Sequence, residues 1–372
     1  LDMSQGVAGP HCGALFAEYG AEVLKIEPPT GDWMRILGAG YDGLSGSFIY
    51  YNRGKKSLCL DLKSDGAIDI VLKLAATCDV VIDNNRPGVS DRLGIGFEAL
   101  KNVNPRIVLV AVSGFGLTGP DSKRPLSDTI AQAMSGFMSI NTGRAGVPAK
   151  VDMTLIDCLT GLYGFQAATM ALWGDPAKRE ARRLDISLVQ CAAAIQGAKV
   201  LEYSVHGKIP DKINAPAGSY RASDGWLALT LVRETCWHRI CTALEREDLR
   251  DDPRFATFDD RARNVEELTR IIDEVIATRT VAEWVARLLE TLVIAGPIND
   301  YGDWMASPQT QAIDGAPMIE VTPGTKAPLV RTPGHGHHTD FAPRLGQHSG
   351  EILRLAGLDD SAIGEMLASG AV

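Results

Sequence analysis

Short apolar runs alternate with longer helix-forming stretches along the first third of the chain. The runs are nearly continuous in Val, Ile and Leu, as strands are when both faces of a parallel sheet are covered. This βαβα order predicts an α/β fold with a Rossmann-like parallel sheet. The predicted strands are Val23–Glu27, Ser57–Leu62, Val80–Asp83 and Ile107–Ser113, and the predicted helices are Cys12–Tyr19, Gly66–Thr77 and Phe97–Asn102.

The rest of the chain is predicted to be mainly helical, with one β-hairpin. A helix of small residues is expected over Gly161–Trp173, and a second over Asp185–His206. Pro210–Pro216 has the composition of a linker. The Asp224-Gly225 turn that follows it predicts a hairpin. The later predicted elements are helices Glu234–Leu244, Val265–Ala277 and Val281–Thr291, strand Met318–Thr322 and a helical region over Leu345–Leu367.

Composition and charge exclude several classes of function. The 372 residues include 37 Lys and Arg against 46 Asp and Glu, and the net charge of −9 argues against binding to nucleic acid or to an anionic membrane. No apolar run reaches the roughly 20 residues of a membrane span. Seven scattered cysteines without a CxxC pair suggest neither disulfides nor zinc, and predict a cytoplasmic protein. No GxGxxG follows a strand, so a dinucleotide site is unsupported.

Asp157 is the strongest candidate for a reactive side chain. It stands at the start of the predicted small-residue helix, where the peptide dipoles would stabilise its ionised form. The small neighbours Thr160, Gly161 and Gly164 leave room for a bulky ligand. Position alone also fits a second interpretation, in which Asp157 is an N-cap that accepts hydrogen bonds from the first free amides of the helix.

Motifs along nearly the whole chain decide between these interpretations by resemblance. In chain order they are Leu1–Pro10, Gly20–Glu27, Gly31-Asp32 with Arg35, Asn52–Lys63, Asn84–Gly88 with Asp91–Gly94, Ser113–Gly116, Ile130–Gly136, Ala149–Leu172, Leu184–Leu188 and Leu345–Ser349. Together they resemble the family III CoA-transferases, a superfamily that includes formyl-CoA and carnitine CoA-transferases and the α-methylacyl-CoA racemases.

The resemblance implies a domain organisation. Residues 1–205 would form the first part of a large Rossmann-like domain that binds CoA and carries out catalysis. Residues 206–324 would form a linker and a smaller α+β domain, and residues 325–372 a C-terminal segment that returns to the large domain. The family also implies a homodimer of interlocked chains, and a true N-terminus upstream of Leu1.

The resemblance assigns chemistry to Asp157. The matching aspartate of the family attacks the thioester of an acyl-CoA donor and forms an acyl anhydride, then an aspartyl-CoA thioester, before a carboxylic acid acceptor takes the CoA. Gln5 lies in the loop that helps to polarise the reacting carbonyl, although a solvent-facing glutamine is an equal alternative. No cofactor is implied, because the CoA thioester is the substrate.

The resemblance also places the CoA molecule. Arginine suits its phosphates because the planar guanidinium pairs with two oxygens. The residues implied in CoA binding are Val7 and Ala8 beside the pantetheine, Leu60 and Lys63 beside the adenine, and Asn84, Asn85, Arg86 and Arg92 along the nucleotide.

Two other functions stay open at this point. An α-methylacyl-CoA racemase would need a histidine where Ser127 precedes Asp128, because moving an α-proton takes two acid/base groups. A non-catalytic CoA-binding protein on the same fold is the other alternative. The His335, His337 and His338 cluster could bind a metal, but it lies in one loop without helical spacing, and we expect no metal site. The acids exchanged are not identified by the sequence.

Overall fold

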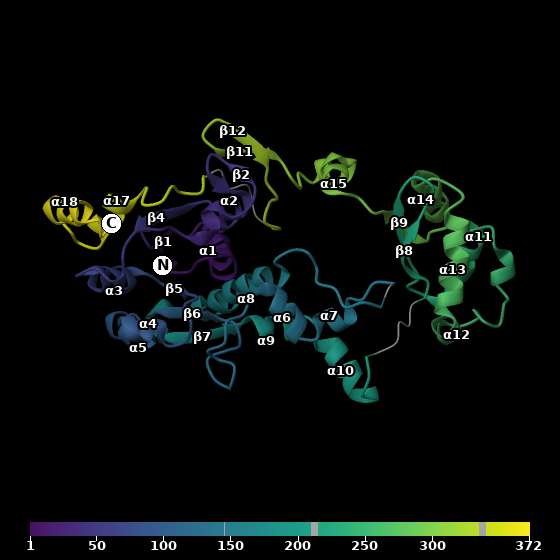
Figure 1. Cartoon of the computed structure of the whole chain (residues 1–372), viewed down its shortest axis with the longest axis horizontal. Helices are drawn as coiled ribbons and strands as arrows, with labels where there is room; N and C mark the ends of the chain where they lie inside the picture. Colours follow the sequence, from purple (N-terminus) through teal and green to yellow (C-terminus); the bar gives the residue numbers. More distant parts are fainter. Residues whose placement is uncertain (145, 210–214, 335–339) are drawn as a thin grey trace. The chain divides into compact units, whose positions relative to one another are not determined.

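The computed structural model describes residues 1–144, 146–209, 215–334 and 340–372 (Figure 1). The contacts divide the chain into two compact units: residues 1–201 with 314–372, and residues 202–313. The division at residues 205 and 324 that the sequence suggested stays a prediction.

A parallel sheet forms the centre of the first unit. Strand β1 (Val23–Glu27) pairs with β4 (Lys55–Cys59), and β6 (Val108–Ser113) lies between β5 (Val80–Asp83) and β7 (Arg182–Ser187). The chain start joins the two groups, because Asp2 forms parallel bridges to Lys25 and Ile82. The predicted α/β fold with a parallel sheet is therefore confirmed.

Both faces of the sheet are covered by helices, which explains the continuously apolar strands. Along β6, Leu109 and Ala111 join a core cluster with helix α3 (Ala67–Thr77), whereas Val108 and Val110 join a cluster with α1 (Ala8–Glu18) and α8 (Leu155–Leu172). Figure 1 shows α8 along the sheet beside α1. The two helices pack closely because Gly161 has no side chain: a Cβ there would lie 2.7 Å from the backbone oxygen of Ala8.

The remaining elements of the first unit are short. They are η1 (Trp33–Ile36), β2 (Gly40–Tyr41), β3 (Leu44–Ser45), α2 (Gly46–Asn52), α4 (Val89–Leu93), α5 (Phe97–Val103), α6 (Asp128–Met134), α7 (Phe137–Ile140), η2 (Pro176–Lys178), α9 (Leu188–Ala194), β11 (Met318–Thr322), β12 (Thr325–Pro328), α17 (Ser349–Leu355) and α18 (Asp360–Ser369). Helix α10 (Gly197–His206) crosses the boundary between the units.

The second unit combines an antiparallel sheet with helices, as expected of a smaller α+β domain. Strand β9 (Trp226–Thr230) lies between β8 (Ala217–Arg221) and β10 (Ile294–Pro297), and β8 and β9 form the predicted hairpin. Its helices are η3 (Glu234–Cys236), α11 (Trp237–Ala243), η4 (Glu247–Leu249), α12 (Phe258–Arg263), α13 (Val265–Ile276), α14 (Val281–Glu290), α15 (Tyr301–Ala306) and α16 (Pro308–Ala312).

The predicted helix over Asp185–His206 was wrong at its start. The segment from Asp185 to Ser187 is the end of strand β7, and α9 and α10 follow it as separate helices. Leu184 and Ile186 alternate with more polar residues, and the strand pairs along its whole length with β6, so pairing outweighed the local helical pattern. The prediction that Leu345–Leu367 is helical is confirmed, because this region contains the two helices α17 and α18.

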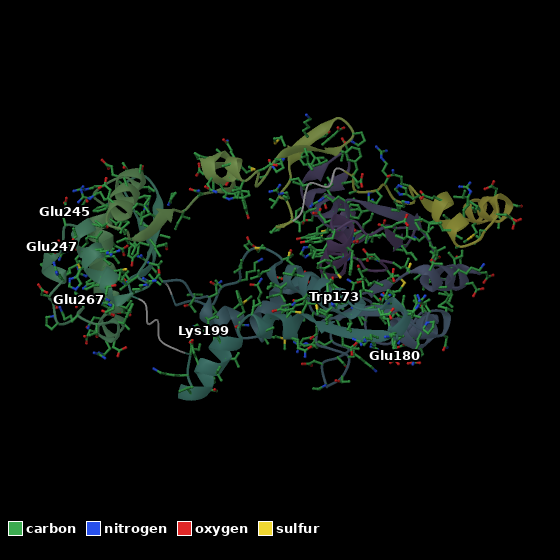
Figure 2. The ribbon with its side chains drawn as sticks, turned by 180° about the vertical axis from the view of Figure 1, so that it is seen from behind. Trp173, Glu180, Lys199, Glu245, Glu247 and Glu267 are labelled. Atoms are coloured by element: carbon green, nitrogen blue, oxygen red, sulfur yellow. The ribbon has the colours of Figure 1, made fainter. Side chains whose placement is uncertain are left out.

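Helix α8 exposes part of its apolar surface. Met170 is 65% exposed, and Trp173, labelled in Figure 2 at the end of this helix, is 84% exposed. By length and composition alone α8 could cross a membrane, but Ile156, Thr160 and Ala168 are buried in the core of the unit. The homodimer stays a prediction.

Candidate active site

Asp157 lies in the first turn of α8, three residues after the N-cap Thr154. The helix is capped from outside, by a carboxylate of α6. Asp128 Oδ1 accepts hydrogen bonds from the backbone N–H groups of Ile156, at 2.6 Å, and of Asp157, at 3.1 Å. The interpretation of Asp157 as an N-cap is therefore wrong, because the helix begins two residues earlier and Asp128 binds the free amides.

The electrostatics of Asp157 also differ from the expectation. Burial, together with the negative charge of Asp128, raises the pKa of the Asp157 carboxyl to about 7. The helix dipole was expected to stabilise the ionised form, but partial desolvation and the neighbouring carboxylate outweigh it. Asp128 itself accepts a third hydrogen bond, from Gln132 Nε2 at 2.6 Å. Asp157 is therefore a carboxylate that changes protonation state near neutral pH.

A cavity of about 440 Å³ brings Asp157 together with most of the residues proposed from the sequence. Segments far apart in the chain meet here. The loop after β5, the loop after β6 and the loop after the first residues of the chain all begin at the carboxyl end of the sheet. The predicted site residues that line this cavity with Asp157 are Gln5, Val7, Ala8, Asn84, Asn85 and Arg86. The structure adds Trp33, Ser113, Ser122, Arg124, Ser127, Asp128 and Leu188.

Three predicted CoA-binding residues lie elsewhere. Leu60 is completely buried in the core cluster of α3. Lys63 is exposed in the turn after β4, and Arg92 is exposed on α4, with its guanidinium next to Gly88. His335, His337 and His338 lie outside the described residues. In the described segments, no three His, Cys, Asp or Glu side chains are grouped so that they could hold a metal ion. The predicted absence of a metal stays a prediction.

The loop of Gln5 is shaped by a glycine and a tryptophan. Gly6 has a φ of +84°, and a Cβ there would lie 2.6 Å from the Trp33 ring, so only glycine fits. The Trp33 side chain is 55% exposed and lines the cavity beside the loop. Trp33 was not predicted as a site residue, since its only local signal in the sequence is its position after the Gly31-Asp32 motif.

Behind the cavity, Cys158 holds α8 against its neighbours. Its backbone oxygen lies 3.0 Å from His11 Nδ1, and its Sγ lies 3.1 Å from the Tyr51 hydroxyl. Burial raises the pKa of the Cys158 thiol, so it stays protonated at neutral pH. Cys158 therefore has the contacts of a packing residue that orients the first turn of α8, in which Asp157 lies.

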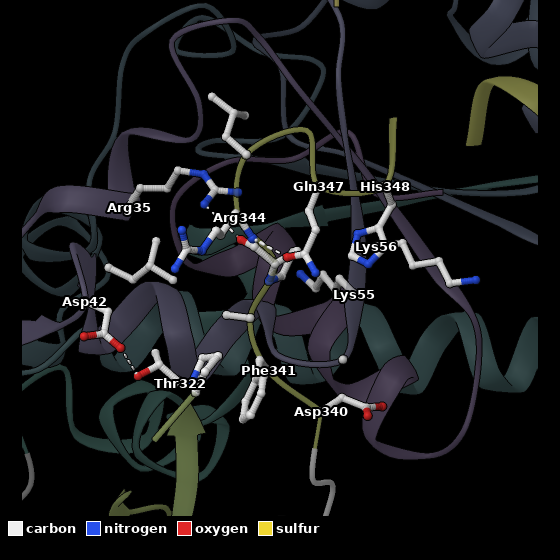
Figure 3. Close-up of a pocket in the computed structure, with 16 residues that line it drawn as sticks. Arg35, Asp42, Lys55, Lys56, Thr322, Asp340, Phe341, Arg344, Gln347 and His348 are labelled. Atoms are coloured by element: carbon white, nitrogen blue, oxygen red, sulfur yellow. Dashed lines mark hydrogen bonds between the residues drawn. The ribbon is translucent and has the colours of Figure 1, made fainter. Parts of the chain in front are cut away.

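A second cavity is larger, about 670 Å³, and is lined by the start of β4 and the segment 340–348 (Figure 3). Several cations line it, but three of them already have carboxylate partners: Lys55 with Asp2, Lys56 with Glu22 and Glu351, and Arg35 with Glu27. Paired cations bind a further anion weakly, whereas the smaller cavity contains Asp157, whose pKa is raised by burial. The smaller cavity at Asp157 is therefore the better candidate for an active site.

Comparison with known proteins identifies the family. Residues 1–349 match the sequence profile of CoA-transferase family III. The chain belongs to this family. It is 32% identical to the succinate–glutarate CoA-transferase of Agrobacterium fabrum over 95% of this chain and 93% of that protein, and 32% identical to the acetyl-CoA:oxalate CoA-transferase of Acetobacter aceti over 95% and 93%. A CaiB/BaiF family protein from Brucella suis superposes with a TM-score of 0.84 at 29% identity, covering 95% of this chain and 97% of that one.

Membership of family III establishes the general reaction of this protein. This family III protein is a CoA-transferase, and its substrates are an acyl-CoA and a carboxylic acid. The alternative of a non-catalytic CoA-binding protein is therefore rejected. The roles of Asp157 and the other site residues stay predictions, as do the cytoplasmic location and the absence of a cofactor.

Proposed function

We propose that Asp157 is the nucleophile of this CoA-transferase. Its ionised carboxylate attacks the carbonyl carbon of the donor thioester; a C–O bond forms, the C–S bond breaks, and CoA leaves as a thiolate. The thiolate then attacks the Asp157 carbonyl of the anhydride and releases the donor acid as a carboxylate. An acceptor carboxylate attacks the carbonyl carbon of the resulting aspartyl-CoA thioester; its C–S bond breaks, and a second anhydride and the CoA thiolate form. The thiolate then attacks the acceptor carbonyl of this anhydride, which gives the acceptor acyl-CoA and releases the Asp157 carboxylate. No net proton is consumed.

This proposal depends mainly on one observation: Asp157 lines the cavity and has a pKa that burial raises to about 7. A carboxylate whose pKa is about 7 is weakly solvated in its ionised form, so it loses little hydration when it attacks. Near neutral pH, about half of the Asp157 carboxyl groups are therefore ionised. Asp128 keeps the first turn of α8 in place through two backbone N–H groups, which fixes the position of Asp157.

We further propose that the acids exchanged include dicarboxylates. The named relatives act on succinate and glutarate or on oxalate. A dicarboxylate keeps one carboxylate ionised while the other reacts, and Asp128 in the same cavity would repel that charge. Arg86 and Arg124 line the cavity and supply two guanidinium groups. Arg124 is half-exposed and already forms an ion pair with Asp121, but at 3.7 Å this pair is looser than those of the second cavity, and we propose that Arg124 exchanges it for the second carboxylate of the substrate.

Trapping of the intermediate tests the covalent role. The protein is incubated with an acyl-CoA and hydroxylamine, and its mass is measured. We expect a hydroxamate adduct on Asp157, and a loss of turnover by several powers of ten in Asp157→Asn and Asp157→Ala. Asp152→Asn is the matched control: this carboxylate lies five residues earlier, is exposed and pairs with Lys150, so activity should be unchanged. More than about a hundredth of the turnover retained by Asp157→Asn would show that the nucleophile is another group.

A further inference from the structure

The backbone of Gln5 is held by one side chain from a distant part of the chain. Asn84, directly after β5, accepts a hydrogen bond from the Gln5 N–H through Oδ1, at 3.0 Å. Its Nδ2 donates to the Gln5 carbonyl oxygen, at 2.7 Å. A single amide therefore binds both backbone groups of a residue that lies 79 positions away. These two bonds use the Oδ1 acceptor and one of the two N–H donors of Asn84.

The peptides on both sides of Gln5 are held by a buried ion pair. Lys25 Nζ donates to the carbonyl oxygen of Ser4, at 2.7 Å, and the Asp32 carboxylate accepts from the N–H of Gly6, at 3.0 Å. Lys25 and Asp32 are 3.0 Å apart, and neither side chain is exposed. Three consecutive residues of the loop are thus bound by side chains from β1, from the loop before η1 and from the end of β5.

Stability alone does not account for this arrangement. Burying a lysine and an aspartate costs desolvation free energy that their attraction roughly offsets, so such a pair contributes little to folding. What Lys25 and Asp32 do provide is a set of fixed contacts with a loop that lines the cavity of Asp157. Groups that polarise a reacting carbonyl have to lie within a few tenths of an ångström of the right position. The network meets that requirement for the peptide groups around Gln5.

We infer that Asn84 is a positioning residue: supported by the Lys25–Asp32 pair, it fixes the backbone of Gln5 for reaction at Asp157, and it is not a nucleotide ligand. This replaces the role that the resemblance suggested for Asn84. The inference rests on the proposed function at Asp157, but its structural half, the restraint of Gln5, can be measured without any turnover.

Asn84→Ala tests the inference with two independent measurements. Hydrogen–deuterium exchange should show the Gln5 amide exchanging at least about tenfold faster, because its acceptor is gone. Steady-state kinetics should show kcat reduced by about tenfold to a hundredfold, since small displacements of catalytic groups have effects of that size. The KM for acyl-CoA and the affinity for free CoA should change less than about twofold, because no CoA contact is lost.

Asn104→Ala is the matched control. Asn104 is also an asparagine that bonds backbone groups, donating to the carbonyl oxygens of Ala75 and Cys78 and accepting from the N–H of Arg106, but it lies away from the cavity. We expect Asn104→Ala to lower the stability of the protein, while kcat and the exchange rate of the Gln5 amide stay as in the wild type. An equal loss of kcat in this control would mean that the effect of Asn84→Ala is only structural, and would overturn the inference.

A second variant carries the test if Asn84→Ala does not fold. Asn84→Asp keeps the size of the side chain and the Oδ1 acceptor, but it places a carboxylate oxygen against the Gln5 carbonyl. It should lower kcat by about tenfold or more. A normal kcat with a tenfold higher KM for acyl-CoA, and unchanged exchange of the Gln5 amide, would show that Asn84 binds the nucleotide after all. If Asp157→Asn were fully active, the proposed function would fail while the exchange result would still decide whether Asn84 restrains Gln5.

Discussion

The pH dependence of the reaction follows from the environment of Asp157, and Asp128→Asn perturbs it. Only the ionised carboxylate attacks a thioester, so activity has to rise with pH through the pKa of Asp157. With a pKa of about 7, the carboxylate is about one tenth ionised at pH 6, half at pH 7 and nine tenths at pH 8. The kcat/KM for acyl-CoA, which reports the free enzyme, should therefore increase by about tenfold between pH 6 and pH 8.

Asp128→Asn removes one of the two causes of the raised pKa. The amide oxygen of the introduced asparagine keeps the acceptor for the first N–H groups of α8, while the negative charge beside Asp157 is lost. The acidic limb of the profile should move to lower pH. It should stay above the ordinary carboxyl range, because burial is the larger cause and is unchanged.

The assay is kcat/KM for one acyl-CoA between pH 5 and pH 9, in the wild type and in Asp128→Asn at equal ionic strength. Titration of the CoA phosphate is the same in both, so the difference between the two profiles belongs to the protein. Identical acidic limbs in the two enzymes, or a wild-type profile that is flat between pH 6 and pH 8, would refute the assignment of this pKa to an Asp157 nucleophile.

The raised pKa of Asp157 also affects folding stability: as the pH rises, activity should increase but stability should decrease. The folded state favours the protonated form of Asp157, so a stability cost develops as the pH rises from the ordinary carboxyl pKa of 3.8 to about 7, and is then constant. Its upper limit is about 4 kcal/mol, because the pKa is raised by roughly three. Asp157→Asn should therefore unfold at a higher temperature than the wild type at pH 8, with the difference disappearing near pH 4.

Two further predictions concern packing and specificity. Gly161→Ala should lower the free energy of unfolding in urea by about 1–3 kcal/mol, because the added Cβ would lie 2.7 Å from the backbone oxygen of Ala8. Alanine normally favours helices, so a solvent-exposed glycine would respond in the opposite direction. Increased stability of the variant would mean that α1 and α8 can move apart without a free-energy cost. Arg124→Ala should raise the KM for the dicarboxylate glutarate about tenfold and leave the KM for the monocarboxylate pentanoate unchanged. Arg106 is exposed and lies outside the cavity, so Arg106→Ala should change neither KM. Equal effects of Arg124→Ala on both acids would show that Arg124 does not recognise the second carboxylate.

The local pattern of the sequence was enough to predict β1, β4, β5 and β6 of the parallel sheet, although β4 begins two residues earlier than predicted. Strands β1 and β5 were predicted with their observed ends, because most of their residues are apolar, as is typical of buried parallel strands. Asp157 was recognised because a carboxylate among small residues at a helix start is a local feature. Strand β7 was missed, since four of its six residues are polar and its pairing with β6 depends on a segment more than 70 residues earlier.

The contacts that hold Asp157 in place and raise its pKa depend on the tertiary structure. Asp128 caps α8 from 28 residues away, and this removes the capping role from Asp157 and helps to raise its pKa. Asn84 binds both backbone groups of Gln5, a contact between residues 79 positions apart that no local pattern indicates. Periodicity and residue type describe each segment by itself, whereas hydrogen bonds and desolvation depend on which distant segments meet. The sequence therefore identified Asp157 and six of the residues that line its cavity, and the fold determined which further residues join them and which of them bind each other.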